Sequence, residues 1–195
     1  MCIERGTVPG DLAREDLVKG PCRGLGAVFV AALAFWVVLG CAGEERPRPG
    51  QAPDFEVVTV DGRTVRLSDY RGAAVLLDFW ATYCPPCKEA LRHEAELQRR
   101  YGPKGLQVLA LALDRDPREV CEYLETHPLP FPVAVVTDEI RQAYGGVTTI
   151  PYAVFIDRTG RIRHRKIGFV PGDEAEFERW VARLVAEGAE PILGP

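Results

Sequence analysis

Residues 78–88 read DFWATYCPPCK and place the end of an apolar strand, two cysteines and the start of a helix within eleven positions. Two thiols at this spacing can close a small disulfide ring across the first turn of a helix. Backbone N–H groups without partners and the helix dipole favour a thiolate at the first sulfur. Pro85 and Pro86 suit the helix start, because proline there gives up an N–H that has no intrahelical partner. The stretch predicts a redox site in which Cys84 is the nucleophile and Cys87 resolves the mixed disulfide.

Strand and helix patterns alternate on both sides of this stretch. Apolar or alternating runs predict strands at residues 55–60, 64–67, 73–80, 106–113, 131–136, 152–157 and 161–168. Amphipathic segments with proline or glycine at their ends predict helices at residues 86–101, 117–127, 138–144 and 173–187. Asp61-Gly62, between the first two strands, is a strong hairpin signal. The order predicts a mixed α/β sandwich with one core.

Two motifs carry a resemblance to a known family. Together with APDF at residues 52–55 and LSDYRG at residues 67–72, the CPPC stretch resembles the thioredoxin superfamily, in its TlpA/ResA/CcmG branch of membrane-tethered thiol:disulfide oxidoreductases. TIPYAVFID at residues 149–157 resembles the cis-proline segment of that family. The resemblance covers residues 52–184. It implies a thioredoxin-like three-layer α/β sandwich with an N-terminal β-hairpin extension and a central insertion.

The resemblance also implies a set of site residues. Pro151 is expected beside the disulfide, and Ile150 before it is expected to offer backbone hydrogen bonds to a substrate peptide. Trp80 is expected to contact substrate as well. Asp78 matches the buried aspartate of thioredoxin, and burial should raise its pKa until it can accept the proton of Cys87. The alternative for Asp78 is a carboxylate held by a structural hydrogen bond.

The active-site helix departs from these relatives. They commonly carry asparagine at the Asp78 position, a glutamate where this chain has Ala90, and a proline where it has Arg92. On a helix, Cys87, Ala90, Glu94, Leu97 and Tyr101 share one face, which should pack on the sheet. Glu94 lies about two turns, ~10 Å, from Cys87. We expect it to be an edge residue that reaches solvent; the alternative is a displaced carboxylate for proton transfer, too far from Cys87 for direct contact.

The N-terminal part of the chain predicts a targeting segment. Residues 25–41 read LGAVFVAALAFWVVLGC, an apolar run that ends abruptly at a polar, proline-rich stretch. The run resembles a bacterial lipoprotein signal with Cys41 as the lipidated residue; a signal anchor and a secreted form are the alternatives. We therefore divide the chain into a leader at residues 1–41, a tether at 42–53, a thioredoxin-like domain at 54–188 and a tail at 189–195.

Composition restricts the partners and the remaining cysteine. The net charge is −4, with 47% hydrophobic and 27% charged residues and no basic patch, so nucleic acid is not expected as a partner. Of the 6 cysteines, Cys121 stands in the predicted helix at 117–127, and we expect a small buried hydrophobe there. We expect the protein to be a monomer.

Two other functions are possible for a paired thiol site. Sco-type relatives carry copper, but they have three residues between the cysteines, and none of the chain's three histidines can be named as a third ligand. Residues 53–72 also resemble peroxiredoxins, whose peroxidatic cysteine needs a threonine or serine three residues earlier and a proline seven earlier. Ala81 and Leu77 occupy those positions before Cys84.

The function expected from the resemblance is an extracytoplasmic thiol:disulfide oxidoreductase that needs no dissociable cofactor and no metal. The Pro-Pro dipeptide between the cysteines lacks the histidine that stabilises the thiolate in strong oxidants, so reduction of protein disulfides is the expected direction. The resemblance implies electrons from a membrane donor of the CcdA or DsbD kind. It also implies a client protein with a disulfide, for which cytochrome c maturation is one setting.

Overall fold

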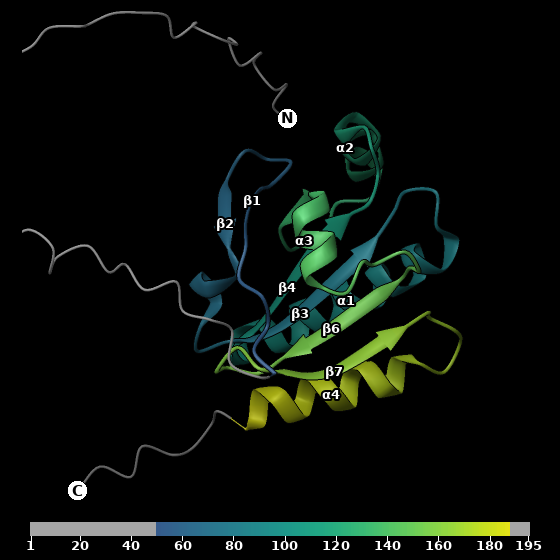
Figure 1. Cartoon of the computed structure of the whole chain (residues 1–195). Coiled ribbons are helices and arrows are strands. Elements are labelled where there is room, and N and C mark those ends of the chain that lie inside the picture. The colour runs from purple at the N-terminus through teal and green to yellow at the C-terminus, as the bar shows by residue number, and fades with distance from the viewer. Residues whose placement is uncertain (1–49, 188–195) are drawn as a thin grey trace, which may run out of the picture. The chain divides into compact units, whose positions relative to one another are not determined.

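A five-stranded sheet organises the part of the chain that the structure, a computed structural model, describes: residues 50–187. The strand order is β5-β4-β3-β6-β7 (Figure 1). The strands are β3 (Ala74–Trp80), β4 (Leu106–Ala112), β5 (Val133–Val135), β6 (Tyr152–Ile156) and β7 (Ile162–Ile167). β3, β4 and β5 are parallel, whereas β6 is antiparallel to β3 and β7 is antiparallel to β6. The predicted leader and Cys41 lie outside the described residues.

The central strand β3 ends beside the helix that carries the cysteines. All seven residues of β3 are buried, because strands lie on both sides of it and both sheet faces are covered. Helix α1 (Pro85–Tyr101) follows after a four-residue connection, and its two N-terminal prolines fit the first helical turn. The short helix η2 (Gly102–Lys104) then leads into β4. The strand and the helix together fix the place of Cys84 and Cys87.

Two apolar cores lie on opposite faces of the sheet. The α1-side core lies between the sheet and helices α1 and α4 (Glu174–Ala186). Its largest members include Leu76, Trp80, Leu91, Phe155 and Phe177. The opposite core lies under α3 (Asp138–Ala143) and the N-terminal hairpin, and it contains the alternate β3 side chains Val75, Leu77 and Phe79. Alternation along β3 thus sends even-numbered side chains toward α1 and odd-numbered ones to the other face.

The hairpin and the segment between β4 and β6 are additions to this framework. β1 (Glu56–Val58) pairs antiparallel with β2 (Thr64–Arg66), followed by the short helix η1 (Leu67–Tyr70). The loop between them includes Gly62 at φ +83°, in the left-handed region that glycine tolerates, and it docks on β5 through Thr59 and Val60. Helix α2 (Pro117–Thr126) starts at Asp116, whose carboxylate accepts from the N–H of Arg118.

The predicted elements are confirmed, with their ends shifted by one or two residues, as is the expected three-layer α/β sandwich with its hairpin. The prediction for Cys121 is wrong. Its side chain is only partly buried, because Val120 is the residue of α2 that enters the core, and the next helical position points about 100° away. Among residues 50–187, no helix is long and apolar enough to cross a bilayer.

Candidate active site

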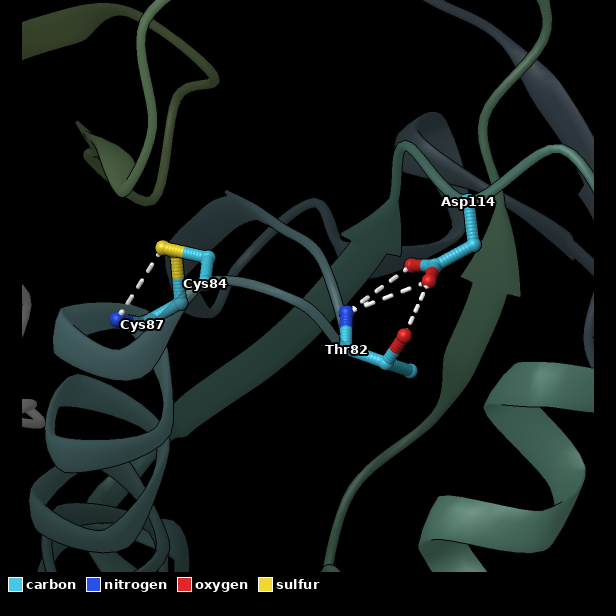
Figure 2. Close-up of a disulfide and its surroundings, with 4 residues drawn as sticks. All are labelled: Thr82, Cys84, Cys87 and Asp114. Atoms are coloured by element: carbon cyan, nitrogen blue, oxygen red, sulfur yellow. Dashed lines mark hydrogen bonds between the residues drawn. A yellow bond between two sulfur atoms is a disulfide. The ribbon is translucent and has the colours of Figure 1, made fainter.

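The two cysteines form a disulfide at the N-terminus of α1 (Figure 2). Cys84 is the N-cap residue, with extended backbone angles, and its Sγ accepts from the N–H of Cys87 at 3.3 Å. The N–H of Cys84 in turn donates to the carbonyl of Ala81 at 3.1 Å, which closes the turn before the helix. The first sulfur therefore lies where a helix N-terminus offers a donor and a positive partial charge. Both stabilise a thiolate once the disulfide is reduced.

The two sulfurs differ in accessibility. Cys84 is 7% exposed and Cys87 is 0% exposed, while the neighbouring side chain of Tyr83 is 68% exposed. An incoming disulfide can therefore reach Cys84 before Cys87, which agrees with their predicted order of action. The sequence analysis did not single out Tyr83. Its place directly before the first cysteine, in a loop, is the signal that could have identified it.

A buried carboxylate fixes the loop between β3 and the disulfide. Asp114, 3% exposed and two residues beyond the end of β4, accepts from the N–H of Thr82 at 3.2 and 3.1 Å and from its hydroxyl (Figure 2). These bonds connect the parallel neighbours β3 and β4 at their carboxyl ends. A tight loop places Cys84 with less variation than a mobile one. Sequence analysis missed this contact, because the two residues are 32 positions apart.

Asp78 lies in the middle of β3 with no exposed surface. Neither carboxyl oxygen has a hydrogen-bond partner among the described residues, and burial raises the pKa of this carboxyl to about 8. The backbone N–H of Phe79 lowers the pKa in part, although its contact lacks the geometry of a hydrogen bond. The buried position predicted for Asp78 is confirmed, and a raised pKa is what its predicted proton transfer requires.

The prediction for Glu94 is wrong. Its side chain is fully buried, and neither carboxyl oxygen has a partner among residues 50–187. The helical face itself was predicted correctly, since Cys87, Ala90 and Leu97 are also fully buried. The error lay in treating a carboxyl on that face as one that must reach solvent. α1 is covered along this face by the sheet, so a side chain there has no route outward.

The other predicted substrate contacts lie in two different environments. The bond between Ile150 and Pro151 is cis, and Ile150 is partly buried against the core that contains both cysteines. Trp80 is 0% exposed, and its indole N–H has no partner in the described residues. A client could touch Trp80 only after the residues that bury it had moved. Its contact with substrate stays a prediction.

Potential metal ligands among the described residues do not gather at this site. Within residues 50–187, no group of three or more His, Cys, Asp or Glu side chains is placed to hold a metal ion. His93, in the active-site helix, lies against the rings of Phe169 and Phe177, each at 6.3 Å between ring centroids. The start of α1 offers two sulfurs, and buried carboxyls lie on β3 and further along α1.

Comparisons with known proteins agree with this chemistry. The sequence model of the AhpC/TSA family matches residues 50–165. Thiol-disulfide oxidoreductase ResA of Bacillus anthracis is 33% identical over 145 residues, which are 72% of this chain and 83% of that protein. The crystal structure of a thiol:disulfide interchange protein of the thioredoxin family from Chlorobium tepidum is 30% identical. It covers 72% of this chain and 99% of its own, with a TM-score of 0.65.

A third relative is described as an exposed lipoprotein. The crystal structure of the exposed lipoprotein thioredoxin of Streptococcus pneumoniae is 28% identical, with a TM-score of 0.59. It covers 68% of this chain and 100% of that chain.

Proposed function

Because the chain belongs to the AhpC/TSA family and is a thiol-disulfide oxidoreductase of the ResA type, we propose that it is an extracytoplasmic, membrane-anchored reductant of protein disulfides. The observation that carries this proposal is the ordered pair of sulfurs at the start of α1. Cys84 is the accessible one, with a backbone donor, and Cys87 is buried beneath it. The dithiol itself holds the two electrons, so the reaction needs no dissociable cofactor.

The reaction proceeds through a mixed disulfide. The Cys84 thiolate attacks one sulfur of the client disulfide, and the other client sulfur leaves as a thiolate that takes a proton from solvent. Cys87 then loses its proton and attacks Cys84. The Cys84–Cys87 bond forms, the bond from Cys84 to the client breaks, and the second client sulfur leaves as a thiolate that is protonated in turn. The client disulfide is reduced to a dithiol and the Cys84–Cys87 dithiol is oxidised.

Asp78 accepts the proton of Cys87 in the second step of this scheme. A carboxyl with a pKa of about 8 is a better base near neutral pH than one at its ordinary value, because its conjugate acid is closer in strength to a thiol. Asp78 also lies on the face of β3 that points toward α1, as do its neighbours Leu76 and Trp80 in the α1-side core.

Client recognition uses the surface around Cys84. Ile150, before the cis proline Pro151, offers backbone groups to an extended client segment, and the exposed ring of Tyr83 offers an apolar contact beside the attacked sulfur. Hydrogen bonds to the backbone of the client depend little on the client's side chains. We therefore expect the protein to accept disulfides in extended segments, of which an apocytochrome c haem-binding motif is one example.

Regeneration and anchoring complete the proposed cycle. A reductant outside the cytoplasm needs electrons from a membrane conduit, which we propose is of the CcdA or DsbD kind. We propose that Cys41 is lipidated, in keeping with the exposed lipoprotein thioredoxin of Streptococcus pneumoniae. Cys41→Ala should abolish incorporation of labelled fatty acid in a bacterial host. An unlabelled wild-type protein that keeps residues 25–41 at the membrane would instead support a signal anchor.

Insulin reduction by dithiothreitol tests the activity. The purified full chain should catalyse the reaction and Cys84→Ser should abolish it, whereas Cys87→Ser should accumulate mixed disulfides because attack survives and resolution does not. Full activity in Cys84→Ser would refute the assignment. The reduction potential of the Cys84–Cys87 pair tests the direction of the reaction. A value of about −270 mV indicates a reductant, and one of about −120 mV indicates an oxidant.

A further inference from the structure

Two carboxyls occupy the layer between the sheet and the active-site helix. Asp78 projects from β3 between Leu76 and Trp80, which belong to the α1-side core. Glu94 projects from α1 on the buried face that also carries Ala90 and Leu97. Both carboxyls are fully buried, and no described residue makes a hydrogen bond to any of their four oxygens. Burying an isolated ionised carboxylate costs several kcal/mol of desolvation free energy. Such a group is therefore expected to have a partner that compensates for this cost.

The side chains beside Asp78 cannot satisfy it. Its register partners on the neighbouring strands are Ala110 of β4 and Ala153 of β6, both fully or almost fully buried in the same core. Register partners point to the same side of a sheet, so Asp78 has a methyl group on each flank where a donor could have stood. The small alanines leave room for a longer side chain from α1. Glu94 is the carboxyl that α1 supplies to this layer.

The two carboxyls interact with each other. Burial raises the pKa of Glu94 well above its ordinary value, and the charge of Asp78 raises it further. Both groups cannot be ionised together, because two negative charges would then lie in a layer without water. A single shared proton would remove this conflict, because a protonated carboxyl can donate a hydrogen bond to an ionised one.

No cation among the described residues enters the layer to take over this role. From α1 the titratable groups are Cys87 and His93, and His93 contacts the aromatic rings of Phe169 and Phe177 instead. The side chains that β4 and β6 contribute to the α1-side core are all apolar. From α2 comes Tyr123, whose ring is tilted against that of Trp80 and lies under the ammonium group of Lys88. α4 contributes Phe177 to the core, and its Glu178 pairs with Arg100 at the surface.

We propose that Glu94 is a positioning residue for proton transfer, which shares one proton with Asp78 and so keeps the Asp78 carboxyl ionisable. Glu94 does not touch the sulfurs; about two helical turns separate it from Cys87. It acts through Asp78, as the donor that this carboxylate otherwise lacks. The inference deepens the proposed function, on which its catalytic consequence rests, while the shared proton itself does not depend on any client.

Two substitutions of Glu94 separate this role from a structural one. Glu94→Gln keeps a neutral donor of nearly the same size, so the pH midpoint at which resolution by Cys87 switches on should stay within about half a unit of wild type. Glu94→Leu fills the space without a donor, and the midpoint should rise by about one unit or more, because Asp78 then ionises alone in an apolar layer. Stopped-flow resolution of a mixed disulfide across pH measures both. Equal midpoints in Glu94→Leu and wild type would overturn the proposal, whatever the variant's thermal stability.

Carboxyl ¹³C NMR of the purified full chain, with the disulfide intact, tests the shared proton without catalysis. In wild type, both carboxyls should report the same two titration steps, and in Asp78→Asn the Glu94 midpoint should fall by about one unit or more. Independent single-step titrations would overturn the shared proton. Wild-type protein that fails to reduce insulin would refute the proposed function but would leave this NMR result standing, so the two failures are distinguishable.

Discussion

Carboxyl groups in two regions of this molecule shift in opposite directions. In the layer between β3 and α1, Asp78 and Glu94 have no cation and no bonded donor among the described residues, and burial raises the pKa of each. Beside β7 and α4, the ammonium group of Lys166 lies 2.9 Å from Asp173 and 3.1 Å from Glu176, and its hydrogen bonds lower both pKa values. The same functional group therefore tends to hold its proton in one region and to stay ionised in the other.

The difference comes from access to water and to cations. β7 is an edge strand with alternating side-chain exposure, so a lysine can reach two carboxylates there without leaving solvent. β3 is the central strand, and every residue of it is buried. A charge on β3 is therefore stabilised only by groups that the fold itself places nearby. The central strand suits a group that must change its protonation, while the edge suits a group that must keep its charge.

The largest expected effect is on the pH dependence of stability. Asp78 binds a proton up to about pH 8 in the folded protein but only up to about pH 4 when unfolded, so its own contribution to stability is fully present below pH ~4 and is lost as pH rises to about 8. The decline should reach about 1.4 kcal/mol per pH unit. The double variant Asp78→Asn, Glu94→Gln should remove it. Urea denaturation of the oxidised proteins from pH 4 to pH 9 measures this, and parallel curves would contradict the raised pKa.

The next effect is kinetic. Asp78→Asn retains the size of the side chain but removes the titrating group, so resolution by Cys87 at neutral pH should slow about 10²-fold, within the usual range for a lost general base. Stopped-flow kinetics of a preformed mixed disulfide would measure the step directly. Glu94→Gln is the matched control, since it changes a carboxyl to an amide in the same layer and should retain most of the rate. An unchanged rate in Asp78→Asn would mean that another group accepts the proton.

A smaller effect is expected at a buried carboxylate that does have donors. Asp114→Ala removes the acceptor of the Thr82 N–H and hydroxyl, and the loss of bonds to a charged group should lower the free energy of unfolding by about 1–3 kcal/mol. Asp114→Asn keeps one acceptor oxygen, so its free energy of unfolding should fall by less. Denaturant titration of the two variants provides the comparison. If both match wild type, these bonds do not hold the loop.

The smallest effect should come from the edge of the sheet. Lys166→Met removes the ammonium group that lowers the pKa values of Asp173 and Glu176. In wild type, the ionised carboxylates stabilise the fold above pH ~4, and this stabilisation is lost as pH falls through their folded-state pKa values. The free energy of unfolding of the variant should therefore be slightly lower than that of wild type at neutral pH and equal to it in acid. Arg100→Met is the control, because it removes from α1 an ion-pair partner of Glu178, a carboxylate of α4. A larger loss than in Asp114→Ala would contradict the ranking.

Local patterns predicted most of the fold. Continuous apolar runs predicted β3 and β4, and the Asp-Gly turn predicted the hairpin, because each depends on neighbouring residues alone. The family motifs then predicted how these elements assemble. Cys121 shows the limit of this approach. Its helix was predicted correctly, but the face that α2 buries is set by the elements packed on it, and that face centres on Val120.

The sequence by itself determined the chemistry of this protein: two thiols at the start of a helix, a carboxyl six residues earlier on an apolar strand, and a proline motif far downstream. Those features follow from spacing along the chain. The tertiary structure alone decided the partners of the carboxyl groups. Asp114 meets Thr82 across 32 residues, and Glu94 enters the layer occupied by Asp78 because the sheet covers that face of α1. Desolvation and contacts between residues far apart in the sequence depend on the tertiary structure, so the periodicity of the sequence does not predict them.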